Sequence, residues 1–174
     1  MTHAPPAPLL FLDIDGPLIP FGAARGPRLG AAPLLEPPAG ANPLAARLDP
    51  GLGPLLTALP CELVWATTWM DEANHTVGPM LGLPTLAVVQ WPDRPDDRVD
   101  AWFGLHWKTR TVVDWAAGRA FVWIDDEIGA GDRDWVSDHH EGRALLYRVD
   151  PRIGLRPGDL AAVAAWLCAP DDGR

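Results

Sequence analysis

The sequence contains a single lysine, Lys108, beside thirteen arginines. Twenty prolines and seventeen glycines among 174 residues indicate a coding bias toward Ala, Pro, Gly and Arg. A lone lysine has a plain explanation as one exposed side chain on a helix. Because this chain otherwise uses arginine throughout, we favour a functional role, and Lys108 is a candidate site residue.

Cysteine is scarce as well, with only Cys61 and Cys168, far apart and without paired spacing. Two such cysteines are typical neither of a disulfide framework nor of a zinc site. The first stretch, MTHAPPAP, lacks the basic and apolar regions of a signal peptide, and no later segment approaches a membrane span. We therefore expect a protein of the reducing cytoplasm, with no membrane partner.

Basic residues are outnumbered by acidic ones, 14 to 23, which gives a formal net charge of -9. Such a chain has no basic field to hold nucleic acid non-specifically. This disfavours a protein that coats a duplex. Any polynucleotide partner would be held locally, at an end or at a single phosphate.

A short apolar run, Leu9 to Leu12, stops abruptly at Asp13, Asp15 and Gly16. A continuous apolar segment followed by a breaker is typical of a strand buried on both faces of a parallel sheet. Ligands of open α/β sheets bind beyond the carboxyl ends of the strands, so two carboxylates there indicate a site. An Asp-Gly turn would explain one aspartate but not two. A calcium loop needs a different glycine spacing.

Strand and helix patterns alternate along the rest of the chain. With 174 residues, 48% of them hydrophobic, the chain suits a single domain spanning 1–174. The expected fold is a three-layer α/β domain with a Rossmann-like, five-stranded parallel sheet. The predicted strands are 9–12, 62–67, 86–90, 120–124 and 145–149, and the predicted helices are 49–59, 71–81, 107–117 and 158–167.

Three segments are expected to be irregular. Residues 17–48 begin with a stretch rich in Pro, Gly and Ala, which predicts a long loop or flap, and loops of this length are often lids or binding loops. Phe21, Arg25 and Arg28 are its candidate ligand contacts. Residues 93–100 are predicted to be a solvated loop, and residues 169–174 a flexible tail.

Polar residues at or near predicted strand ends occur in a fixed order along the chain. They are Asp13 and Asp15, Thr67 at the end of LVWAT, Lys108, and Asp125 and Asp126 in FVWIDDE. This order resembles the four motifs of the haloacid dehalogenase (HAD) superfamily of phosphohydrolases. Within that superfamily, the stretches WATTWMDEAN and HWKTRTVVDW are similar to the HAD domains of bacterial Swiss-Army-knife RNA-repair proteins.

The resemblance implies a HAD-type phosphatase that forms an aspartyl-phosphate. Asp13 would attack the phosphorus, and Asp15 would protonate the leaving group and later activate water. Thr67 and Lys108 would hold the phosphoryl oxygens, and the lysine would also offset repulsion among the carboxylates. Phosphoryl transfer needs these parts: an in-line nucleophile, neutralising cations and a proton shuttle.

A magnesium ion is the cofactor that the resemblance implies, and Mg²⁺ suits a few carboxylates together with water and phosphate oxygens. Its expected ligands are Asp13, the backbone carbonyl of Asp15, Asp125, and Asp126 directly or through water. Thr68 remains an alternative to Thr67 as the phosphate contact. The expected substrate-binding residues are Gly16, Thr68, Trp69 and Lys108.

Six of the nine tryptophans are assigned to two groups. Those within strand or helix patterns are expected in the core, whereas those just beyond strand ends or near Lys108 are candidates for stacking on a ligand. The core group is Trp65, Trp115 and Trp123, and the stacking group is Trp69, Trp91 and Trp107.

Members of the family often carry a cap domain, but neither interval that could hold one has the pattern of an independent unit. We therefore expect minimal or no cap and an open site, which suits the terminal phosphate of an RNA or DNA. Three alternatives remain: a small-metabolite phosphatase, a phosphotransferase, or a binding module that kept the fold without turnover. No obligate protein partner is inferred.

Overall fold

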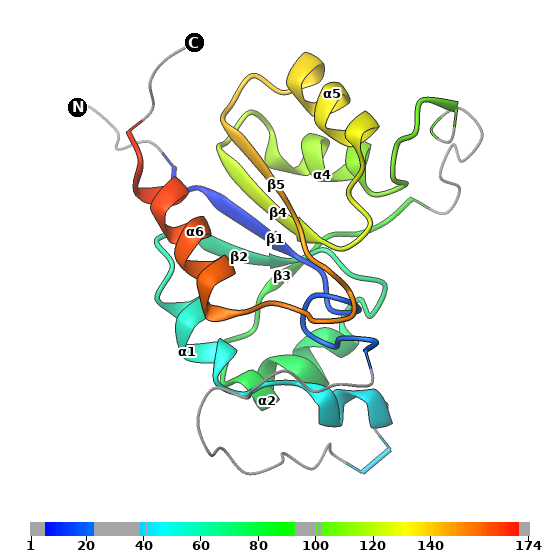
Figure 1. The fold of residues 1–174 in the computed structure, drawn as a ribbon, viewed down its shortest axis with the longest axis vertical. Coiled ribbons are helices and arrows are strands. Elements are labelled where there is room, and N and C mark those ends of the chain that lie inside the picture. The colour runs from blue at the N-terminus through cyan, green and yellow to red at the C-terminus, as the bar shows by residue number, and fades with distance from the viewer. Residues whose placement is uncertain (1–5, 23–38, 41, 93–99, 101, 171–174) are drawn as a thin grey trace.

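The computed structural model describes residues 6–22, 39–40, 42–92, 100 and 102–170 (Figure 1). A sheet of five parallel strands lies at its centre, in the order β3-β2-β1-β4-β5. This confirms the predicted α/β class with a Rossmann-like parallel sheet. The strands are β1 (Leu9–Leu12), β2 (Glu62–Trp65), β3 (Ala87–Val88), β4 (Phe121–Asp125) and β5 (Ala144–Arg148).

Helices cover both faces of this sheet and complete the three layers (Figure 1). The helices α1, α2 and α6 pack against one face, and α4 and α5 pack against the other. The α-helices are α1 (Leu52–Thr57), α2 (Gly78–Leu81), α4 (Thr109–Ala116), α5 (Ala130–His139) and α6 (Pro157–Cys168).

The central strand β1 is buried completely, on both faces. Leu10 and Leu12 pack into the layer of α1, α2 and α6, whereas Leu9 and Phe11 pack into the layer of α4 and α5. Because side chains alternate along a strand, burial on both faces requires an unbroken apolar run. The run LLFL is therefore the sequence signal of a central parallel strand.

Helix α5 is absent from the sequence predictions because AGDRDWVSDH has no apolar stripe. Only Asp132 and Val136 of this helix are buried. The Asp132 carboxylate accepts hydrogen bonds from the backbone N–H groups of His106 and Gly129 and from the hydroxyl of Thr109. Asp132 therefore anchors the helix through buried hydrogen bonds, two of them to residues distant in the chain. Such polar contacts leave no hydrophobic period in the sequence.

Most predicted elements match to within a few residues at each end, and two predicted segments differ in the kind of structure they contain. The predicted helix 71–81 contains a π-helical turn, Ala73–Val77, before α2 begins. The predicted excursion 17–48 is not wholly irregular, because Leu18 and Ile19 are buried and Pro43–Arg47 forms a 3-10 helix. Residues 23–38, with Arg25 and Arg28, lie outside the described part of the chain.

The predicted loop 93–100 and tail 169–174 fall mostly outside the described residues, which include only Asp100, Ala169 and Pro170 of these segments. Asp100 is buried rather than solvated, and its carboxylate accepts a hydrogen bond from Arg110 Nε at 2.6 Å. No helix in the described part of the chain is long and apolar enough to cross a bilayer.

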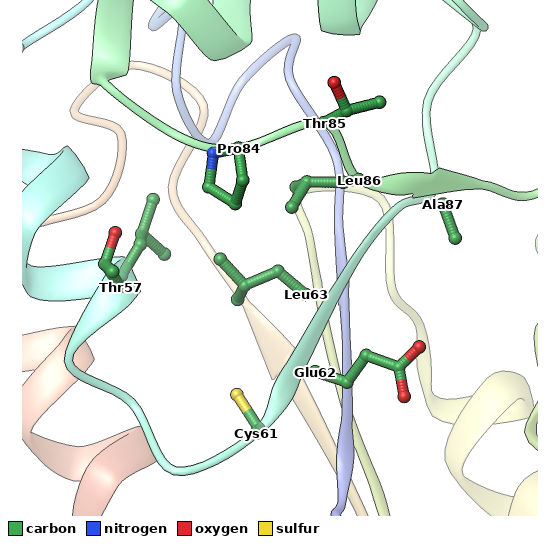
Figure 2. Close-up of a pocket in the computed structure, with 9 residues that line it drawn as sticks. Thr57, Cys61, Glu62, Leu63, Pro84, Thr85, Leu86 and Ala87 are labelled. Carbon is green, nitrogen blue, oxygen red and sulfur yellow. The ribbon is translucent and has the colours of Figure 1, made fainter.

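A hollow of about 310 Å³ lies where β2 and β3 begin, at the edge of the sheet opposite the strand-end aspartates (Figure 2). Its wall is largely apolar and includes Leu56, Leu63 and Leu86. Burial raises the pKa of the Cys61 thiol in this wall to about 11, so the sulfur stays protonated and poorly nucleophilic at neutral pH. The one carboxylate of its wall, Glu62, is paired with Arg119, and the site aspartates lie at the opposite edge of the sheet.

Close packing of α1 on α2 depends on Gly53, because a Cβ at this position would lie 1.7 Å from the backbone oxygen of Leu81. Gly53→Ala should lower the free energy of unfolding by about 1–3 kcal/mol, since backbone must shift to relieve the clash. The matched control is Gly158→Ala in α6, where an added Cβ meets nothing within 4 Å. That change should raise stability by about 0.5–1 kcal/mol. Urea unfolding of both variants tests the contrast, and equal stabilities would contradict the packing described.

Candidate active site

The carboxyl ends of β1, β2 and β4 meet at one edge of the sheet, because these three strands are parallel and adjacent. Leu12 pairs with Trp65 on one side and with Ile124 on the other. The next residues along β1 and β4 are therefore neighbours, and the Asp13 N–H donates to the Ile124 carbonyl at 3.1 Å. This register brings Asp13 and Asp125 together, as the sequence predicts.

Lys108 joins these two aspartates. Its Nζ lies 2.9 Å from Asp13 Oδ2 and 2.9 Å from Asp125 Oδ2, and only 3% of the lysine side chain is exposed. The same ammonium lies 5.9 Å and 5.6 Å from the ring centroids of Trp91 and Trp107, within the range of cation–π attraction. The single lysine of the chain is therefore a buried cation between two carboxylates and two indole rings.

The protonation of this pair reflects opposing effects. Burial raises the pKa of the Asp13 carboxyl to about 7, and the Asp125 carboxylate adds to the rise while Lys108 opposes it. Burial lowers the pKa of the Lys108 ammonium, but Asp13 and Asp125 outweigh burial and raise it above its ordinary value. Lys108 is thus positively charged at neutral pH, beside a carboxylate that is poorly solvated.

Asp126 reaches the same cluster because Gly16 leaves room for it. A Cβ at Gly16 would lie 2.5 Å from Asp126 Cγ, and Gly16 has a positive φ of 88° that favours glycine. Burial, and then the Asp125 carboxylate, raise the pKa of Asp126. Gly16 therefore contributes space and backbone shape to the site.

Three carboxylates of the site have the chemistry and spacing of a cation site. Oxygen atoms of Asp13, Asp125 and Asp126 all lie within 4.8 Å of one another. Hard oxygen donors at this spacing fit a divalent cation such as Mg²⁺ or Ca²⁺. Ionised carboxylates also retain spare lone pairs while they accept hydrogen bonds from lysine.

The segment after β2 contributes the threonines and Trp69. Thr67 is buried, and its Oγ1 accepts the backbone N–H of Trp69 at 3.3 Å, whereas Thr68 is exposed. The indole Nε1 of Trp69 donates a 2.9 Å hydrogen bond to Asp15 Oδ2. Trp69 thus lies beside Asp15, and its polar atom is directed at a protein carboxylate.

Two other predicted stacking residues, Trp91 and Trp107, lie edge to face with their ring centroids 4.8 Å apart. The Nε1 of Trp91 donates to the Thr67 carbonyl at 3.0 Å. Both rings are half-buried beside Lys108. Trp65 and Trp123 are fully buried, as predicted for core residues, while Trp115 is partly buried against Phe11.

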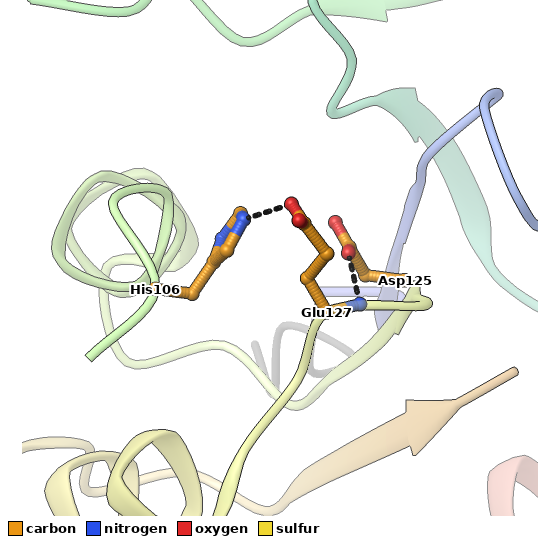
Figure 3. A group of neighbouring side chains, drawn as sticks. All are labelled: His106, Asp125 and Glu127. Atoms are coloured by element: carbon orange, nitrogen blue, oxygen red, sulfur yellow. Dashed lines mark hydrogen bonds and ion pairs between the residues drawn. The ribbon is translucent and has the colours of Figure 1, made fainter. Parts of the chain in front are cut away.

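The sequence reasoning did not single out His106, which lies beside Glu127 and Asp125 (Figure 3). His106 Nδ1 faces the backbone N–H of Lys108 at 3.3 Å, so a neutral ring carries its proton on Nε2 and donates to Glu127 Oε2 at 2.9 Å. This trio therefore forms a hydrogen-bonded edge of the site, with Asp125 Oδ1 accepting the Glu127 N–H at 3.0 Å.

Large exposed aromatic side chains lie close in sequence to the site. Trp102 is 86% exposed and Phe103 60% exposed, on the segment that leads into His106 and Lys108. Phe21, a candidate contact from the sequence, is 54% exposed. The pair Trp102 and Phe103 was not predicted, because solvent exposure of an aromatic residue has no sequence signal.

Comparison with known families agrees with this geometry. Residues 9–160 match the family model of the HAD domain in Swiss Army Knife RNA repair proteins. No curated protein and no solved structure is significantly similar to the chain. The matched range contains all of the site residues described above, from Asp13 to Glu127. The chain therefore belongs to the family of HAD domains found in Swiss Army Knife RNA repair proteins, a membership that supports a HAD-type phosphohydrolase.

Proposed function

We propose that the protein is a magnesium-dependent phosphohydrolase that forms an aspartyl-phosphate on Asp13. The observation that carries this proposal is the Lys108 ammonium, held 2.9 Å from both Asp13 and Asp125 at the carboxyl ends of β1 and β4. A buried cation beside a nucleophilic carboxylate supplies the positive charge that the phosphoryl oxygens need in the transition state.

In the first step, the Asp13 carboxylate attacks phosphorus, and the bond from phosphorus to the leaving oxygen breaks. Asp15 donates its proton to that oxygen. In the second step, Asp15 takes a proton from water, the resulting hydroxide attacks the aspartyl-phosphate, and inorganic phosphate leaves with Asp13 regenerated. Lys108 and Thr67 hold the phosphoryl oxygens during both steps.

Asp13, Asp125 and Asp126 would hold Mg²⁺, together with the backbone carbonyl of Asp15 that the family implies. Their oxygens lie close enough for a shared cation. A bound Mg²⁺ would offset the repulsion among these carboxylates and polarise the phosphoryl group.

Asp13→Asn should remove turnover and leave the fold intact, because Lys108 keeps Asp125 as an ionic partner. Phosphate release and the urea midpoint of the variant measure the two effects. Asp138→Asn, an exposed change on α5, is the matched control and should retain full activity. Retained turnover in Asp13→Asn, with contamination excluded, would falsify the role of Asp13.

Removal of divalent cations should abolish activity, and added Mg²⁺ should restore it, because three carboxylates and one ammonium leave the site with excess negative charge. Initial rates in chelator, and after Mg²⁺ is added back, test this dependence. Asp126→Asn should raise the Mg²⁺ concentration needed for half-maximal rate. Equal rates in chelator and in Mg²⁺ would contradict a metal-assisted reaction.

The substrate that we propose is a terminal phosphate of a nucleic acid. Three observations support it: the family described for RNA repair proteins, the exposed aromatics Trp102 and Phe103, and the absence of a second folded unit among the described residues between β1 and α4. Unpaired bases stack well on exposed aromatic rings. The alternatives are a small-metabolite phosphatase or phosphotransferase, and a binding module without turnover.

A 3′-phosphorylated oligonucleotide should have a higher kcat/KM than a mononucleotide or a sugar phosphate at one salt concentration. The double variant Trp102→Ala/Phe103→Ala should lower kcat/KM for the oligonucleotide by about tenfold or more, since one stacked base contributes roughly 1–3 kcal/mol. The mononucleotide rate should stay unchanged. Leu44→Ala removes another exposed apolar side chain, in the 3-10 helix, and is the control. A sugar phosphate that wins by an order of magnitude would favour the small-metabolite alternative.

A further inference from the structure

One hydrogen bond joins the segment after β1 to the segment after β2. The indole Nε1 of Trp69 donates to Asp15 Oδ2 at 2.9 Å, across 54 positions of sequence. Among the described residues, this is the only hydrogen bond or ion pair of the Asp15 carboxyl. Asp15 Oδ1 therefore has no protein partner in the described part of the chain.

Trp69 is itself held firmly. Its backbone N–H donates to Thr67 Oγ1, its carbonyl accepts the N–H of Glu72 at 3.1 Å, and its ring packs against the hydrophobic core. Met70, directly after it, has a positive φ of 50°, so the chain turns sharply here. The indole N–H thus has a fixed direction, set by both backbone and ring.

The chemistry of an indole N–H makes this bond asymmetric. An indole nitrogen is a donor only and never an acceptor, so the Asp15 oxygen that faces it acts as an acceptor. When the carboxyl is protonated, this arrangement favours the proton on Oδ1. The protonated oxygen is then the one without a protein partner, which is what a general acid needs.

We propose that Trp69 is a positioning residue for general acid catalysis, which holds the Asp15 carboxyl so that Oδ1 presents its proton to the leaving oxygen. This inference rests on the proposed phosphohydrolase function. In this role the Trp69 indole acts mainly by orienting Asp15, and not by direct contact with substrate.

The test is Trp69→Phe, which keeps an aromatic ring at this position and removes the N–H donor, although the ring is smaller than an indole. General acid catalysis matters for a poor leaving group and little for an acidic one. We therefore expect kcat/KM for an alkyl phosphate to fall at least roughly tenfold, and kcat/KM for p-nitrophenyl phosphate to fall much less. Asp15→Asn should show the same dependence on the leaving group, to a greater extent.

Trp65→Phe is the matched control, because it also removes an indole N–H. That N–H donates to Asn74 Oδ1 at 3.0 Å and makes no contact with Asp15. It should leave the ratio of the two kcat/KM values unchanged. An equal loss on both substrates in Trp69→Phe, or no loss on either, would overturn the positioning role while Asp13→Asn stays inactive. Activity that survives in Asp13→Asn would instead overturn the phosphohydrolase mechanism, and this inference with it.

Discussion

The site depends on one buried ionic contact, the Lys108 ammonium between Asp13 and Asp125. A buried charge without a partner is strongly unfavourable, and removal of one partner of a buried pair often costs roughly 3–5 kcal/mol. Lys108 has two carboxylate partners and two indole faces around it, so its position at the start of α4 is fixed by the ends of β1 and β4. The charged site therefore exists only when the sheet edge is formed.

The parallel sheet makes this contact possible because it places the carboxyl ends of neighbouring strands at one edge. β1 lies in the centre, with β2 and β4 at its sides, so polar residues that follow three separate strands converge without any long loop. Gly16 and the tight return of the chain at Leu18 and Ile19 then admit Asp126 from the neighbouring strand end. In each of these strands, the apolar residues are buried and stabilise the sheet, and the polar residues at the carboxyl end form the site.

This division explains what the sequence could predict. Leu9–Leu12, Thr67, Lys108 and Asp125 are visible because each depends on local pattern: an apolar run, its end, or the scarcity of lysine. Helix α5 was not visible, because the buried Asp132 and its three partners hold it in place of an apolar stripe.

The hydrogen bond from Trp69 to Asp15 and the pair His106–Glu127 also have no sequence signal. Both join side chains that are distant in the chain, and only the packed sheet brings them together. Local pattern therefore locates the charged centre of the site, while the contacts that orient its side chains require the tertiary structure.

The charge balance at the strand ends also constrains how a phosphorylated ligand enters. Asp13, Asp125 and Asp126 lie together against a single ammonium, and the rest of the chain adds to a net charge of -9. A phosphate monoester brings further negative charge, which burial makes costly to hold beside carboxylates. Under the proposed function, attraction would therefore come from Lys108 and from a cation held by these carboxylates, so affinity for the cation and for the phosphate should be coupled.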